Sequence, residues 1–182
     1  MPMTTKEIFE EEIAKFDDWK FPVEILEGFC PAEELENMGC GQYTKEQVEA
    51  MSSTLAGSTY WEETAPYVDK VSFWPEAAEY IWQHKLLLVL AAEQFGSPKT
   101  IAELITGIVR HEHEHMLQVL ALRKAGFDLS KTVEIETQGT VDYGAGPLES
   151  FAFKAQRGEV INREEFLAAY KAAEDSYNNA DR

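Results

Sequence analysis

Apolar residues recur at helical spacing in several segments of the chain, and each of these segments begins with a residue suited to cap a helix. The first segment follows a capping box of Thr4 and Glu7 and predicts a helix over about residues 5–18. A second capping box, Thr44 with Gln47, begins the next apolar pattern. Further helices are predicted on the same grounds over residues 44–57, over residues 147–156 and from Asn162 onward.

Breaker residues separate these segments. Residues 21–41 hold several glycines and prolines and predict loops, with one short helix around residues 32–38. Residues 58–74 are predicted to form an aromatic-rich connection. Residues 132–147 contain three glycines and a short alternating stretch, which predicts a loop or a small hairpin.

The two longest predicted helices lie in the middle of the chain. Pro75 suits the first position of a helix, and residues 76–95 then run without a breaker. Ser97 caps a second helix over about residues 98–125. Because only a few residues join them, we expect an antiparallel helical hairpin. The sequence therefore predicts a single all-α domain over residues 1–182, a four-helix bundle built around this hairpin, with a C-terminal loop plus helices.

The composition restricts the partners of the protein. Of the 182 residues, 33 are Asp or Glu and 16 are Lys or Arg, which gives a formal charge of −17. This charge repels phosphate backbones and anionic lipid surfaces, so we expect neither nucleic acid nor a membrane as partner. The longest apolar run, residues 86–92, is too short to span a bilayer. Because 45% of the residues are hydrophobic, the chain can bury a core, which argues against a wholly disordered acidic protein.

The N-terminal residues and the cysteines bear on the compartment. Residues 1–5 lack the basic start and the apolar stretch of a secretory signal, so a cytoplasmic protein is expected. Cys30 and Cys40 show no CxxC spacing and predict neither a disulfide framework nor a zinc knuckle.

One cluster of residues carries chemistry: the run HEHEH over residues 111–115, which falls inside a predicted helix. On a helical wheel, Glu112 lies near the centre of the apolar face, with His115 close beside it and His111 on the flank. His113 and Glu114 point off that face and are predicted to be surface residues.

His84 lies on the most apolar strip of the preceding predicted helix and is expected to be buried. In the hairpin, a rise of about 1.5 Å per residue puts His84 within about 3 Å of His111 in height and about 9 Å or less from His115. Three imidazoles and a carboxylate in an apolar interior need compensation, which a divalent metal supplies. We therefore predict that His84, His111 and His115 bind Zn, Fe, Mn or Ni. Glu112 is either an outer carboxylate behind the ligands, a ligand to a second metal ion, or a catalytic general base.

Other interpretations of these residues stay open. The histidines are alternatively satisfied by hydrogen bonds to buried hydroxyls or water. His111, Glu114 and His115 also fit the inverted zincin pattern HxxEH, which is set aside because Glu114 is expected to point away from the shared face. Glu12 lies on the apolar side of the first helix, either as a carboxylate ligand or as a residue at the rim of the core.

The stretch HEHEHMLQVLALRKAG resembles the last-helix signature of the DinB/YfiT-like superfamily over 16 of the 182 residues. The matching positions are His111, Glu112, His115, Gln118, Arg123 and Gly126. The resemblance implies a four-helix bundle that binds one divalent metal through three histidines. It also implies activities among thiol-dependent transferases, isomerases and hydrolases.

Glu112 and His115 also resemble the ExxH element of ferritin-like bundles, which bind two metal ions. A full set needs a second ExxH, but Ile81, Ile108 and Arg110 stand three residues before the other histidines. A ferritin-like di-metal oxidoreductase is therefore an alternative to the mononuclear site.

The favoured prediction is a mononuclear metalloenzyme, a hydrolase or thiol-dependent transferase that acts on a small-molecule substrate. A non-enzymatic alternative is an acidic helical adaptor or chaperone whose aromatic surface binds a partner. Apolar residues on more than one side of the helix over residues 76–95 favour a homodimer. Because protonated imidazole cannot ligate, metal affinity is expected to fall as the pH drops through the histidine range.

Overall fold

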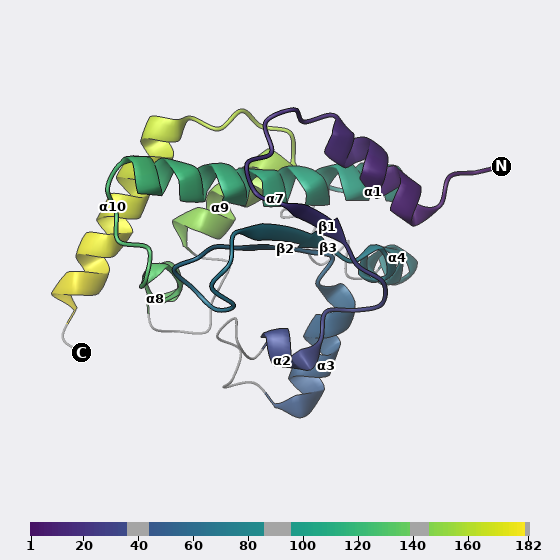
Figure 1. Cartoon of the computed structure of the whole chain (residues 1–182), viewed down its shortest axis with the longest axis horizontal. Helices are drawn as coiled ribbons and strands as arrows, with labels where there is room; N and C mark the ends of the chain where they lie inside the picture. Colours follow the sequence, from purple (N-terminus) through teal and green to yellow (C-terminus); the bar gives the residue numbers. More distant parts are fainter. Residues whose placement is uncertain (36–43, 86–95, 139–145, 181–182) are drawn as a thin grey trace.

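One long helix organises the fold. The structure is a computed structural model that describes residues 1–35, 44–85, 96–138 and 146–180, and α7 (Ile101–Lys124) runs through its centre (Figure 1). Strand β2 (Gly57–Tyr60) and four helices contact α7, namely α1 (Thr5–Ala14), α4 (Pro75–Gln83), α9 (Pro147–Gln156) and α10 (Arg163–Asn179). Because neighbours surround α7, its buried residues lie on more than one face.

A small sheet lies beside α7 and corrects the prediction of an all-α four-helix bundle. Its strand order is β1-β3-β2, where β1 spans Val23–Ile25 and β3 spans Lys70–Phe73. β1 pairs parallel to β3, with Val23 opposite Val71, and β2 pairs antiparallel to β3. The strands have only three or four residues. An alternating pattern cannot be recognised over so short a length, so these segments were predicted as loops and as an aromatic connection.

The helix caps agree with the sequence. The capping boxes at Thr4 and at Thr44 are both present, and they begin α1 and α3 (Lys45–Thr54). The side chain of Asn162 accepts a hydrogen bond from the backbone N–H of Glu165 at the start of α10. α9 begins at Pro147 as predicted, and a short helix, α2, covers Ala32–Leu35.

The segment predicted as a loop or a small hairpin contains a helix instead. α8 spans Thr132–Thr137, and its buried residues are Thr132, Ile135, Glu136 and Thr137, whereas Val133 of the alternating stretch is only partly buried. Gln138 ends α8 in the left-handed conformation, with φ of 52°. Local alternation over five residues is therefore compatible with a short helix when tertiary contacts bury one side.

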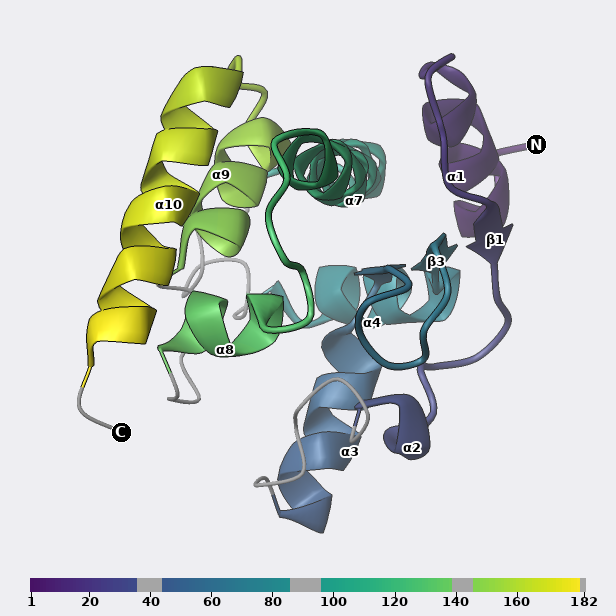
Figure 2. The same cartoon turned by 60° about the vertical axis from the view of Figure 1, so that its left-hand side comes forward.

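The predicted antiparallel hairpin is also wrong in the part that the structure describes. α4 ends at Gln83, and residues 86–95 lie outside the described part of the chain. Figures 1 and 2 show α4 crossing α7 steeply: where one helix is seen end-on, the other is seen from the side. α7 starts after Thr100, whose side chain accepts a hydrogen bond from Glu103, and not at the predicted cap Ser97.

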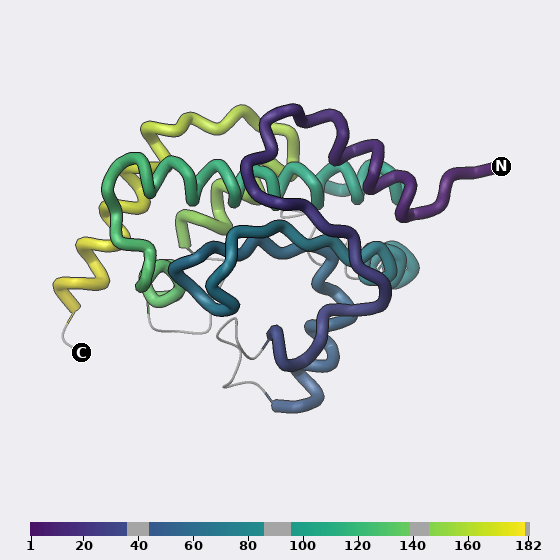
Figure 3. Tube along the Cα trace, viewed as in Figure 1, coloured from purple at the N-terminus to yellow at the C-terminus, as the bar shows by residue number. Residues whose placement is uncertain are grey.

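The core fills the space between α7, the sheet and the C-terminal helices. Its largest fully buried side chains include Trp74, Tyr170, Phe9, Phe73, Phe166, Leu104 and Met116. The backbone trace shows the N-terminal helix α1 and the C-terminal helix α10 at opposite ends of the molecule (Figure 3). Within the described residues, the helices are too short or too polar to cross a membrane.

Candidate metal centre

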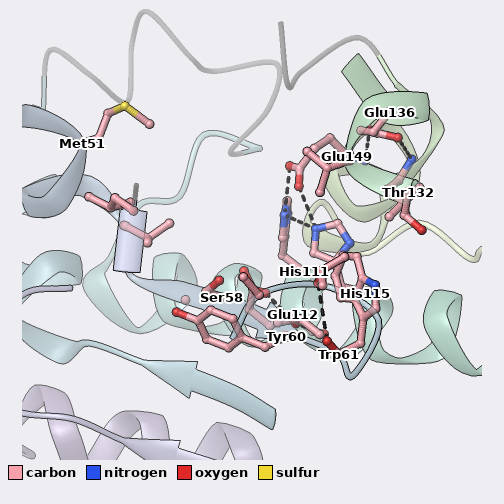
Figure 4. A pocket seen from close by; sticks show the side chains of 18 residues that line it. Met51, Ser58, Tyr60, Trp61, His111, Glu112, His115, Thr132, Glu136 and Glu149 are labelled. Carbon is pink, nitrogen blue, oxygen red and sulfur yellow. Dashed lines mark hydrogen bonds and ion pairs between the residues drawn. The ribbon is translucent and has the colours of Figure 1, made fainter. Parts of the chain in front are cut away.

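Three side chains bring metal-binding atoms together at the middle of α7. His111 and His115 are one helical turn apart, and their Nε2 atoms are 3.1 Å apart. Glu149, from the first turn of α9, places Oε1 at 2.8 Å from Nε2 of His115 and Oε2 at 3.3 Å from Nε2 of His111. Figure 4 shows the carboxylate facing both imidazole rings. One ligand atom from each of the three residues lies within 4.8 Å of the others, so the group could hold a metal ion.

Two glutamines orient the imidazoles. Nδ1 of His111 lies 2.9 Å from Oε1 of Gln156, and Nδ1 of His115 lies 3.0 Å from Oε1 of Gln118. The amide of Gln118 is fixed in this orientation because its Nε2 donates to the carbonyl of Leu148. An amide oxygen only accepts hydrogen bonds, so both Nδ1 atoms are the protonated ones. Both Nε2 atoms are thus left to bind a metal or a proton, as in histidines that ligate metals.

The contact between His115 and Glu149 shifts the pKa of both side chains. Burial lowers the pKa of His115, but the charge of Glu149 and the hydrogen bond with it outweigh this effect and raise the pKa to about 10. Burial raises the pKa of Glu149, yet the positive charge of the histidines holds it well below its usual range. In the metal-free protein, an imidazolium and a carboxylate therefore compensate each other at neutral pH.

A buried carboxylate places Glu149. The N-cap of α9 is Gly146, which has no side chain to cap the helix. Instead, Glu136 accepts hydrogen bonds from the backbone N–H groups of Leu148 and Glu149, both at 2.9 Å. A Cβ at position 146 would lie 2.2 Å from Cδ of Glu136, so this capping requires glycine. Burial raises the pKa of Glu136 to about 7, against the effect of these hydrogen bonds.

Glu112, the predicted catalytic residue, lies beside the group and not within it. It is 6% exposed, and its Oε2 accepts a hydrogen bond of 2.8 Å from the hydroxyl of Thr59 on β2. Its aliphatic part passes over Gly57, where a Cβ would lie 2.7 Å from Cγ of Glu112. The close approach of α7 to β2 at this glycine fixes the carboxylate in a wall of the pocket.

A pocket of about 360 Å³ opens over the group. Its walls come from β2, from the loop that follows it, and from α2, α3, α7, α8 and α9. The apolar and aromatic part of this lining consists of Leu35, Met51, Leu55, Tyr60, Trp61, Ala65, Val133 and Leu148. Glu112, His111, His115, Glu136 and Glu149 reach the same pocket, which has the size of a small-ligand site (Figure 4).

The structure does not bring His84 to this site. His84 follows the last residue of α4, is exposed, and stacks on Tyr80 with ring centroids 4.0 Å apart. Its Nδ1 lies 2.8 Å from the backbone carbonyl of Tyr80. The predicted burial of His84 depended on a continuous helix over residues 76–95, whereas α4 ends at Gln83. Glu149, and not His84, lies within ligand distance of His111 and His115.

His113 and Glu114 are buried, which corrects their prediction as surface residues. Nε2 of His113 lies 2.7 Å from Oδ1 of Asp18, and the ring stacks on Phe16 at 4.1 Å between centroids. Glu114 pairs with Arg163 of α10, with Oε1 at 2.6 Å from a guanidinium nitrogen. Because neighbouring elements cover α7 on several sides, residues outside its single apolar face are buried as well.

The remaining candidates lie away from the metal group. Glu12 is buried but forms an ion pair with Lys15 on its own helix. Glu114 faces Arg163 rather than the two histidines of the HxxEH pattern. Arg123 binds Glu63 and Asp69 and so holds the loop between β2 and β3 against α7.

Metal uptake is expected to release protons and to strengthen with pH. At neutral pH the metal must displace the proton of His115, whose pKa is raised to about 10. Affinity should therefore increase about tenfold per pH unit between pH 7 and 9, well above the ordinary histidine range. The stability of the metal-free fold changes with pH in the opposite direction. The His115–Glu149 pair stabilises this fold fully below the unfolded histidine pKa of about 6.5. The stabilisation is lost as the pH rises through about 10, the pKa of His115 in the folded protein.

Calorimetry in buffers of different ionisation enthalpy checks the proton release at pH 7.5. We expect about one proton per bound zinc ion. A His84→Ala variant should release the same number, since His84 is not in the group. Uptake without proton release would show that His115 is already neutral before the metal binds.

Sequence reasoning missed Glu149 and Gln156. A glutamate in the first turn of a helix is ordinary because it faces the positive end of the helix dipole, so nothing in the sequence marked Glu149 as a ligand. Gln156 ends the same helix and carries no motif. Gln118 was a matching position of the DinB/YfiT-like resemblance, and the structure shows its contact with His115.

Comparisons with family models, with curated proteins and with solved structures find no match for this chain. The DinB/YfiT-like and ferritin-like resemblances therefore stay predictions based on the motif in α7.

Proposed function

We propose that this protein is a mononuclear metalloenzyme of the hydrolase type, in which His111, His115 and Glu149 hold one divalent ion at the floor of the pocket. The convergence of two oriented imidazoles and a carboxylate beneath a cavity carries the proposal. Two histidines and a glutamate are the ligand set of many hydrolytic zinc sites, and Fe(II) also accepts such a set. The predicted thiol-dependent transferase would use the same ligands.

The ion would supply Lewis acidity, lowering the pKa of a water molecule or polarising a carbonyl group in the pocket. The protein contributes the orientation of its ligands through Gln118 and Gln156, and an apolar wall that limits water. Glu112 is the candidate general base, because its carboxylate is held by Thr59 in the wall of the same pocket.

The proposal predicts that Glu112→Gln separates metal binding from catalysis. The variant keeps the hydrogen bond from Thr59 but cannot take up a proton, so hydrolysis of uncharged aryl esters and amides should fall by about 10²- to 10⁴-fold. Metal content, measured by elemental mass spectrometry, should stay at the wild-type value. Glu134→Gln on the exposed side of α8 is the matched control and should retain full activity.

Two results would contradict the proposal. Turnover by Glu112→Gln at the wild-type rate would remove Glu112 from catalysis. A zinc-, iron- or manganese-loaded wild type without activity on any member of the ester and amide panel would contradict the hydrolase assignment.

A further inference from the structure

Carboxylates are the most numerous ionisable groups in the described lining of the pocket. Three carboxylates reach the cavity, from Glu112, Glu136 and Glu149, together with two histidines. Neither Lys nor Arg occurs in the described lining. The internal ranges outside the described residues, 36–43, 86–95 and 139–145, contain no Lys or Arg in sequence either.

Cations near the pocket are already paired. Lys70 lies over the ring of Tyr60, but its ammonium is 3.0 Å from a carboxylate oxygen of Glu24. Arg123 is held by two carboxylates of the loop between β2 and β3. Neither residue lines the pocket, so neither offers a counter-charge to an anionic ligand inside it.

When Glu112, Glu136 and Glu149 are all ionised, their negative charge exceeds the positive charge of the site. With one of the two imidazoles protonated, three carboxylates still leave the lining negative. With a divalent ion on the two histidines and Glu149, the carboxylates exceed the charge of the ion by one. The aromatic rings of Tyr60 and Trp61 in the wall add a surface that attracts cations.

We propose that this pocket selects an amine-bearing substrate with a compact apolar body and disfavours carboxylates and phosphates of the same shape. The apolar wall and the volume of about 360 Å³ accommodate the body, and the carboxylates attract the ammonium group. An amine-bearing compound would be the substrate of the proposed hydrolase, so its role as a substrate rests on that proposed function.

A series of matched ligands tests the charge preference apart from catalysis. The probes are 3-phenylpropylammonium, 3-phenylpropanol and 3-phenylpropionate, titrated calorimetrically into the full chain after chelation of metal, at low ionic strength. The ammonium should bind at least about tenfold more tightly than the carboxylate, with the alcohol between them. High salt should reduce this ratio, since it screens charges.

Two variants test whether the preference for the ammonium ligand arises from the carboxylates of the pocket. Glu112→Gln should reduce the ratio of the affinity for the ammonium to the affinity for the carboxylate. Glu134→Gln removes an exposed charge from α8 and should leave this ratio of affinities unchanged. The wild-type series does not depend on the folding of either variant. Equal or tighter binding of the carboxylate to the metal-free chain would overturn the inference, as would the absence of binding by all three ligands at millimolar concentration.

Metal content distinguishes this failure from failure of the proposed function. If the ammonium is preferred but the chain takes up no metal, the proposed hydrolase fails and the charge selectivity of the pocket stands. If the chain binds one ion but the carboxylate is preferred in the metal-free state, the substrate class fails and the metal site stands.

Discussion

Replacing His115 with Ala is expected to lower the metal content of the chain from about one ion to less than about one tenth of an ion. His115 supplies one of the three converging ligand atoms and also the contact through which Glu149 is held at 2.8 Å. Glu149→Gln should have a similar effect, because an amide is a poor metal ligand. Loss of an outer partner of a ligand typically costs 10- to 100-fold in affinity, so we expect loss of a ligand itself to exceed about 100-fold.

Elemental mass spectrometry on chains reconstituted with zinc, iron, manganese or nickel measures this effect. His84→Ala is the matched control, since it also removes an imidazole but lies outside the group. It should retain the full content of metal. Loss of metal in His84→Ala with retention in Glu149→Gln would restore the ligand set of three histidines that the sequence predicted.

The second large effect is expected at Arg163. Arg163→Met leaves the carboxylate of Glu114, which is 3% exposed, without its cationic partner. Removal of one partner of a buried ion pair costs about 3–5 kcal/mol of unfolding free energy. Because the side chain of Arg163 is 30% exposed and partly screened by water, we expect a loss near the lower end, about 3 kcal/mol, at pH 8.

The pH dependence of the stability loss in Arg163→Met identifies the physical cause of that loss. Burial raises the pKa of Glu114, although the charge of Arg163 opposes the shift. A carboxyl group with a raised pKa destabilises the fold where it is ionised, and this cost disappears as the pH falls through that pKa. The penalty of Arg163→Met should therefore shrink between pH 8 and pH 5 in urea unfolding experiments.

Two further variants control the measurement. Lys171→Met removes a cation from the same helix, where Lys171 pairs with the exposed Asp175, and it should change stability by less than about 0.5 kcal/mol. Adding Glu114→Gln to Arg163→Met removes the unpaired charge and should recover much of the lost stability. A pH-independent loss in Arg163→Met would instead indicate that its packing over Phe166, at 5.4 Å, accounts for the effect.

Local signals in the sequence were sufficient for the starts of α1, α3 and α10. The capping boxes at Thr4 and Thr44 and the cap at Asn162 join residues three positions apart. Such contacts form within one turn of chain and need no distant partner, so they are visible in sequence. The same holds for the pairing of His111 and His115, because a spacing of four residues aligns two side chains on any helix.

The sheet and the end of α4 depended on tertiary contacts. β1 has three residues, and its partner β3 lies 48 positions further along the chain. A strand of that length is stabilised by its neighbours and not by its own propensity. No glycine or proline marks the end of α4 at Gln83, so the sequence gives no reason for the helix to stop before His84.

The sequence by itself indicated the HEHEH run as the candidate metal site, because His111 and His115 are four residues apart on one helix. Only the tertiary structure decided which further residue joins them. Glu149 lies 34 positions from His115 and reaches it because Glu136 caps α9 at Gly146. His84 lies nearer in sequence but stays on the surface. A ligand set is a property of distances in space, and residues far apart in the chain acquire those distances only when the helices pack.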